Sequence, residues 1–151
     1  ELMEKKLKTA EDMGFETINA GESDPVEAVK KMTGGTGADA VIVAVGITAA
    51  NEQALAMVKE TDGRILFFAA GYPAPELKID SNILHYRRLE LFGTFAADSI
   101  DFFTAGEMLS SGAVDVSKLV EPETFTLDQV QEAFQCAAAP GMYRVSIKLN
   151  D

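Results

Sequence analysis

The sequence predicts an α/β protein in which parallel strands form a doubly wound layer covered by helices. Two apolar runs support this prediction, AVIVAV at Ala40–Val45 and ILFFAA at Ile65–Ala70. Neither run alternates polar and apolar residues, which is typical of a strand buried on both faces. Helical patterns lie between the runs, and such alternation of helices with apolar strands favours a parallel sheet.

Two helices are predicted ahead of the first strand. In Leu2–Gly14 the apolar residues recur every three or four positions, with Lys and Glu on the other face. The second helix begins at Asp24, the N-cap, with Pro25 in the first helical position and Glu27 in capping-box register. The stretch Glu16–Asn19 between them is expected to be extended.

The middle of the chain continues the alternation of helices and strands. Thr48–Glu60 is predicted to be a helix, Ser81–Arg87 a helical turn, and Leu89–Phe95 a third buried strand. A further helix is expected over Ser99–Ser110, because Asp98 is well placed to cap its first turn. These elements complete the predicted parallel α/β layer.

The tail of the chain has a different pattern. Leu119–Phe125 contains Pro122, which argues against a central strand. Thr126 and Gln129 then have the spacing of a capping box and predict another helix. Tyr143–Leu149 alternates polar and apolar residues, so we expect a half-buried strand in a second sheet.

Composition excludes several function classes. The 151 residues include 13 Lys and Arg against 24 Asp and Glu, and the formal net charge is −11. Because nucleic acids and anionic membranes repel such a chain, we expect neither as a partner. No apolar run approaches the roughly 18 residues that a membrane span needs.

The single cysteine and single histidine narrow the chemistry further. With only Cys136 and His85, the chain can form no internal disulfide and no four-ligand Cys/His zinc site. The sequence starts at Glu1 without the pattern of a signal peptide, so we expect a cytoplasmic protein and a piece of a longer chain. No metal ligands and no catalytic residues are predicted.

Few residues have the setting of a reaction centre. His85 and its neighbours Tyr86–Arg88 are expected to form a solvated loop, and Cys136 to be a small core residue on the last helix. Gly34–Gly37 follows a helix rather than a strand, so it is interpreted as a simple connection rather than a phosphate loop.

The ends of the three apolar strands are more informative. They read Val45-Gly46, Ala69-Ala70-Gly71 and Gly93-Thr94. Ligands of open α/β sheets bind outside the carboxyl ends of the strands, and small residues there allow a flat ligand to approach the backbone. The alternative is that these glycines only turn the chain, and the spacing does not separate the two explanations.

Four segments together resemble the zinc-type medium-chain alcohol dehydrogenases, in particular the sorbitol, threonine and related polyol dehydrogenases. They are DPVEAVKKMTGGTGADAVIVAVG (Asp24–Gly46), DGRILFFAAG (Asp62–Gly71), NILHYRRLELFGTF (Asn82–Phe95) and FTLDQVQEAF (Phe125–Phe134). The resemblance implies a Rossmann-like doubly wound sheet that binds NAD or NADP, without the family's first strand and Gly-rich turn. It also implies a C-terminal strand-helix-strand segment that belongs to a GroES-like catalytic domain, with domains at 1–118 and 119–151.

The resemblance also implies the residues that contact the cofactor. Glu1 falls at the acidic position that holds the adenine ribose, which favours NAD over NADP, and Lys6 is the basic residue five positions later. Arg144 falls at a basic position that can reach the pyrophosphate, although a solvent-facing strand residue is the alternative. The nicotinamide half would lie against main-chain groups of Ala44, Val45, Gly46, Phe68, Ala69, Ala70 and the surroundings of Thr94.

The family's zinc ligands and proton relay have no counterpart in this sequence. The resemblance therefore implies the cofactor-binding part of a zinc-dependent oxidoreductase that moves hydride between an alcohol or polyol and NAD(P), inactive as an isolated chain. Two alternatives remain, a truncated non-catalytic nucleotide-binding or assembly module, and the zinc-free quinone-reductase branch. The family also implies a homodimer or homotetramer, with zinc only in the parent enzyme.

Overall fold

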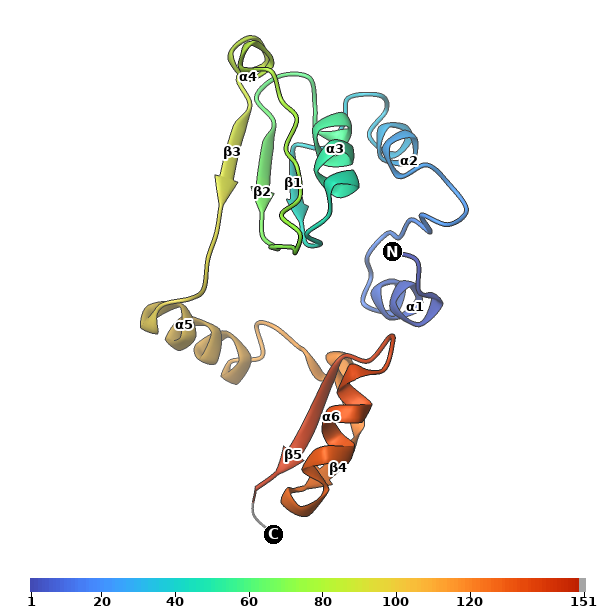
Figure 1. The fold of residues 1–151 in the computed structure, drawn as a ribbon, viewed down its shortest axis with the longest axis vertical. Coiled ribbons are helices and arrows are strands. Elements are labelled where there is room, and N and C mark those ends of the chain that lie inside the picture. Colours follow the sequence, from blue (N-terminus) through green and yellow to red (C-terminus); the bar gives the residue numbers. More distant parts are fainter. Residues whose placement is uncertain (150–151) are drawn as a thin grey trace. The chain divides into compact units, whose positions relative to one another are not determined.

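A computed structural model describes residues 1–149, so the last two residues of the predicted segment 119–151 lie outside the described residues (Figure 1). The chain forms two compact units. We call Glu1–Leu2 with Ile18–Ala96 unit 1, and Met3–Thr17 with the chain from Ala97 onward unit 2. Each unit is described by itself.

Unit 1 contains a parallel three-stranded sheet with strand order β1-β2-β3. The strands are β1 (Ala40–Val43), β2 (Arg64–Phe67) and β3 (Glu90–Gly93). Val43 pairs with Phe67, and Phe67 with Gly93, so the three strands end on the same rung. The parallel strands connected by helices confirm the predicted α/β class, and β1 and β3 are the two edges of this sheet.

Three helices of unit 1 begin and end close to the predicted positions. They are α2 (Pro25–Met32), α3 (Thr48–Met57) and α4 (Ser81–Arg87). The Asp24 side chain accepts hydrogen bonds from the N–H groups of Val26 (2.8 Å) and Glu27 (3.2 Å), as expected for an N-cap. Helix α3 is shorter than predicted because Val58 leaves it and forms a parallel β-bridge with Ala38.

The core of unit 1 lies between β1, β2 and α3. Ile65 is fully buried, at 0% exposed, and packs with Val43, Ala54 and Val58. Full burial of a side chain of this size contributes roughly 1.5–3 kcal/mol. The outer strands are less covered, since Ile42 of β1 is 63% exposed.

Among the described residues, unit 2 contains a second, smaller parallel sheet, three α-helices and two 3₁₀ turns. Its elements are α1 (Glu4–Asp12), α5 (Ser99–Ser110), the 3₁₀ turns Ser117–Leu119 and Leu127–Gln129, β4 (Val120–Thr126), α6 (Val130–Ala138) and β5 (Arg144–Lys148). Strands β4 and β5 pair only with each other among the described residues, which confirms the predicted second sheet. Among the described residues of this unit, the buried hydrophobic side chains are those of Leu7, Phe125 and Ala133.

Two capping predictions in unit 2 are confirmed. Asp98 and Asp101 form a reciprocal capping box at the start of α5, and Thr126 and Gln129 form another ahead of α6. Pro122 lies inside β4, where the pairing register with β5 shifts between Val120 and Thr124. A proline is tolerated at such an irregularity because no ladder hydrogen bond depends on its missing N–H.

Candidate functional site

The carboxyl ends of β1, β2 and β3 lie along one edge of the sheet of unit 1, where the three arrowheads of Figure 1 point the same way. Ala44, Phe68 and Thr94 come directly after the last paired residues of the three strands. The fold therefore brings together the residues predicted to contact the nicotinamide half of the cofactor. Such an edge is where open α/β sheets bind ligands.

The loops that leave β1 and β2 touch each other through their backbones. The Val43 carbonyl accepts hydrogen bonds from the N–H groups of Phe68 (3.1 Å) and Ala69 (3.0 Å). Gly46 and Gly71 follow Val43 and Phe68 by three residues each. They lie so close together that a Cβ on either glycine would overlap the backbone of the other loop. Neither glycine has a positive φ, so close loop packing, rather than a tight turn, explains why both positions are glycine.

The surface at these strand ends is formed by apolar, uncharged side chains. Ala44 and Ala70 are exposed, and so are the larger side chains of Val45 and Phe68. Alanine, valine and phenylalanine contain no group that could donate or accept a proton at neutral pH. This surface can hold a flat ring through main-chain hydrogen bonds and apolar contact, but its side chains supply no acid or base.

The loop after β2 is also hydrogen-bonded to helix α3. Glu76 donates its N–H to Thr48 Oγ1 (3.0 Å), and its carbonyl accepts from Asn51 Nδ2 (2.8 Å). Asn51 is only 5% exposed. Sequence reasoning missed both residues, although a polar pair three positions apart in the helical segment TAANEQALAM is a signal that could have identified them.

Glu1 and Lys6, the residues predicted at the adenine ribose, belong to different units. In unit 1, the exposed Glu1 donates its terminal ammonium to the Ile18 carbonyl (3.1 Å) and accepts a hydrogen bond from the Leu2 N–H on Oε1 (2.8 Å). In unit 2, Lys6 Nζ lies 5.9 Å from the ring centroid of Tyr143, a cation–π distance.

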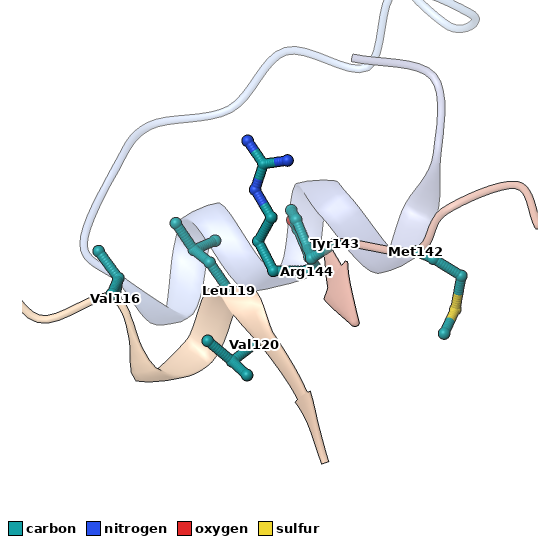
Figure 2. Close-up of a pocket in the computed structure, with 6 residues that line it drawn as sticks. All are labelled: Val116, Leu119, Val120, Met142, Tyr143 and Arg144. Atoms are coloured by element: carbon teal, nitrogen blue, oxygen red, sulfur yellow. The ribbon is translucent and has the colours of Figure 1, made fainter. Parts of the chain in front are cut away.

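Arg144 begins β5 and lines a pocket of about 500 Å³ in unit 2 (Figure 2). The lining is mostly apolar, formed by Val116, Leu119, Val120, Met142, Tyr143 and Arg144. Figure 2 shows the guanidinium of Arg144 extending away from the strand beside Leu119 and Tyr143. Its exposed, planar set of donors suits an anionic group.

The segment that precedes Arg144 is held by a half-buried carboxylate. Glu121 Oε1 accepts hydrogen bonds from Lys5 Nζ (2.7 Å) and from the Tyr143 N–H (2.8 Å). The Lys5 ammonium, followed by the Tyr143 N–H, lowers the pKa of the Glu121 carboxyl below its ordinary value of 4.5. Glu121 was not predicted as a site residue, because both of its partners are distant in sequence.

The expectation of a solvated loop at Tyr86–Arg88 is confirmed only in part, since Tyr86 and Arg88 are exposed but α4 extends through Arg87. Arg87 closes α4 and donates to three carbonyls, from Nε to Glu60 (2.9 Å) and from Nη2 to Lys59 (3.2 Å) and Val58 (3.3 Å). A guanidinium has several N–H donors in one plane, so it can hydrogen-bond carbonyls that have no partner within a helix.

The other candidates lie outside the strand-end site. His85 is exposed on α4 with its ring edge-on to Tyr86, 5.0 Å between centroids, and Cys136 is a half-buried free thiol on α6. Gly37 packs against the backbone of Met57 and Lys59 with a φ of +88°, as a connection between elements requires.

Residues 1–149 contain no group of three or more His, Cys, Asp or Glu side chains that could hold a metal ion. The described residues therefore do not form a zinc site, and we assign no step through zinc to them. Within the same residues, no helix is both long and apolar enough to cross a bilayer.

Comparison with known proteins gives consistent results. The chain is 30% identical over 146 residues to an erythritol/L-threitol dehydrogenase of Mycolicibacterium smegmatis, covering 95% of this chain and 39% of the relative. It is 30% identical over 135 residues to the sorbitol dehydrogenase of Bacillus subtilis, covering 87% of this chain and 36% of the relative. A Sinorhizobium meliloti 1021 protein crystallised with NADP has the same fold, with a TM-score of 0.85 and 20% identity over 99% of this chain and 44% of its own.

The chain thus spans between 33% and 39% of the length of the curated relatives it matches. A family model for zinc-binding dehydrogenases matches residues 1–111, about three quarters of the chain. That match covers α1 to α5, and with them the three parallel strands and the loops at their carboxyl ends. The chain belongs to the zinc-binding dehydrogenase family.

Proposed function

We propose that this chain is the cofactor-binding part of an oxidoreductase that transfers hydride between an alcohol or polyol and NAD(P). The observation that carries the proposal is the edge at which Ala44, Phe68 and Thr94 follow three parallel strands on one rung. The named relatives act on erythritol, L-threitol and sorbitol according to their names, which supports a polyol substrate. The NADP-bound structural neighbour supports a dinucleotide ligand.

On this proposal, the chain's own task is to bind and orient the nicotinamide. Main-chain groups of Ala44–Gly46 and Phe68–Ala70 would line the ring, and those other than the Phe68 and Ala69 N–H groups, which already donate to the Val43 carbonyl, would hydrogen-bond its carboxamide. The apolar side chains beside them would exclude water from one face of the ring. Orientation of the ring sets which face exchanges hydride with the alcohol carbon. Zinc and proton transfer would belong to residues outside this chain.

We propose a domain boundary at residue 118. Residues 1–118 would form the partial dinucleotide-binding domain, and 119–151 the segment that returns to a GroES-like catalytic domain. Support comes from β4 and β5, which form a sheet of their own rather than extending β1-β2-β3, although the compact unit that contains them also includes α1 and α5. Arg144, at the start of β5, would then contribute its guanidinium to the pyrophosphate.

We further propose a cytoplasmic homodimer or homotetramer. The exposed edge residues of β1 and β3 support association, since unpaired strand edges favour pairing with another chain. The single Cys136, which leaves no internal disulfide, is compatible with a reducing compartment.

The test is binding and turnover with two proteins, the full-length protein that contains this sequence and the isolated 151-residue chain. The full-length protein should bind NAD(H) and reduce NAD in the presence of sorbitol or erythritol. The isolated chain should show no alcohol-dependent reduction, with or without added zinc. Full-length protein that binds no dinucleotide would favour the non-catalytic assembly module instead, and reduction of quinones with NADPH would favour the quinone-reductase branch.

A further inference from the structure

The segment 68–76 after β2 is attached at three successive places to the segment 43–51 after β1. First, the N–H groups of Phe68 and Ala69 both donate to the Val43 carbonyl. Next, Gly71 packs against the backbone of Gly46. Last, Glu76 is bonded through both its N–H and its carbonyl to side chains of α3. Segment 43–51 therefore fixes the path of segment 68–76.

The third attachment differs from the first two because it depends on side chains. Thr48 and Asn51 lie one turn apart on α3 and together satisfy both main-chain polar groups of Glu76. Asn51 is 5% exposed, and a buried amide of this kind is costly to leave without its partner. Both hydrogen bonds to Glu76 come from the side chains of Thr48 and Asn51. Substitution of these side chains can therefore remove the bonds without changing the sequence of the loop.

The residues proposed to contact the cofactor lie in the same loop as Glu76, at its other end. Phe68, Ala69 and Ala70 precede Glu76 by six to eight residues and lie in the same loop. A loop fixed at both ends keeps one conformation, and a ligand that binds it loses less entropy than one that must order it. Attachment of Glu76 to α3 therefore also affects ligand binding at Phe68–Ala70.

We infer that Thr48 and Asn51 are positioning residues that hold segment 68–76 in the conformation in which Phe68–Ala70 receive the nicotinamide. This inference rests on the proposed function, and it names two residues that act through the loop without touching the cofactor. It follows that their loss weakens cofactor binding more than substrate binding.

The test uses the full-length protein that contains this sequence and a set of matched variants. Thr48→Val removes the hydroxyl while keeping the shape, and Thr48→Ser keeps the hydroxyl. Asn51→Leu removes the buried amide. Ala54→Gly is the stability control, because Ala54 is buried in the same helix and makes no bond to Glu76.

Two measurements are compared, amide hydrogen exchange across 68–76 and the KM values for NAD(H) and for the alcohol. Thr48→Val and Asn51→Leu should each raise the KM for NAD(H) by up to about tenfold, as expected for one lost hydrogen bond, with the alcohol KM changed less than about twofold. Exchange across 68–76 should rise in parallel. Thr48→Ser should keep both the KM for NAD(H) and the exchange across 68–76 at their wild-type values. Ala54→Gly should lower the melting temperature without changing the KM for NAD(H).

The outcomes separate this inference from the proposed function. Faster exchange with an unchanged KM for NAD(H) would show a purely structural role and overturn the inference, as would unchanged exchange. An equal rise of KM in Ala54→Gly would assign the effect to stability and also overturn it. Wild-type protein that binds no dinucleotide would instead overturn the proposed function, and the inference with it. If Asn51→Leu does not fold, the pair Thr48→Val and Thr48→Ser decides alone.

Discussion

Gly46 and Gly71, from loops that follow two neighbouring strands, pack backbone against backbone at the edge where the cofactor is proposed to bind. The two loops therefore form one continuous surface rather than two separate turns. A side chain at either position would push the loops apart, and with them the main-chain groups on both sides.

Gly71→Ala should destabilise the protein. Its Cβ would overlap the carbonyl of Gly46, and overpacking of this kind costs roughly 1–3 kcal/mol. Urea unfolding measures the loss. Gly106→Ala is the matched control, because Gly106 lies in α5 with open space around it, and alanine there should stabilise the helix by about 0.5–1 kcal/mol. Equal effects of the two substitutions would contradict the packing argument.

Arg87→Lys should destabilise unit 1 although it keeps the positive charge. Arg87 donates to three carbonyls from two nitrogens, and a single ammonium cannot reproduce that fork. We expect a loss of about 2 kcal/mol in the free energy of unfolding, measured by thermal or chemical denaturation. The control is Arg64→Lys, at an exposed ion pair with Glu90, where the change should be below about 0.5 kcal/mol.

Acid should weaken unit 2 through Glu121. Its pKa is lowered in the folded state, chiefly by the Lys5 hydrogen bond, so its contribution to stability is complete above the ordinary value of 4.5. The contribution is lost as the pH falls from 4.5 toward the folded-state pKa. Glu121→Gln should therefore flatten the pH dependence of unfolding in this range, whereas substitution of the exposed Glu123 on the same strand should not. Identical acid profiles for all three proteins would contradict this role.

Cofactor preference should depend on Glu1. A carboxylate at the ribose accepts hydrogen bonds from both hydroxyls and repels a 2′-phosphate, so the full-length protein should prefer NAD to NADP. Glu1→Ser should reduce that preference about tenfold or more, measured as the ratio of kcat/KM for the two cofactors. Preference for NADP in the unsubstituted protein would contradict the assignment of Glu1.

The isolated chain should associate through its strand edges. Ile42 of β1 is 63% exposed and Phe92 of β3 is 47% exposed, and both strands have one side without a partner among the described residues. Light scattering at micromolar concentration should show a dimer or larger species, despite the opposing net charge of −11. Phe92→Lys should reduce association, whereas Phe103→Lys on α5 should not. A 16.2 kDa monomer, stable on dilution and in moderate salt, would contradict this prediction.

Features that depend on neighbouring residues were predictable from the sequence. The β-branched run at Ala40–Val45 predicted β1, and the spacing of Asp98 and Asp101 matches the capping box that begins α5. Contacts across the sequence were not predictable. The bond between Asn51 and Glu76 joins residues 25 positions apart, and Arg87 reaches carbonyls up to 29 positions away. Periodicity reports which face of an element is buried, but it does not identify the partner of a polar side chain.

The candidate binding residues also differ in how far the sequence alone could place them. Residues at strand ends, such as Ala44 and Phe68, could be placed from the sequence because parallel strands end at a common edge. Glu1 and Lys6 could be proposed only through the family resemblance, because nothing local distinguishes them from other charged residues. Arg144 is intermediate, since its strand was predicted from alternation and its pocket depends on distant residues.

The division of the chain into units has a consequence for folding. Residues 18–96 of unit 1 lie in the sequence between the two parts of unit 2, so Lys5 and Glu121, which pair at 2.7 Å, are 116 positions apart. The intervening chain is a closed loop, and the entropic cost of closure grows with the logarithm of the number of flexible residues in it. Once unit 1 has folded, its residues no longer count as flexible, and closure of the loop costs less. We therefore expect unit 2 to assemble after unit 1, with α1 as the last element to join β4, as the dependence of folding rate on contact order implies.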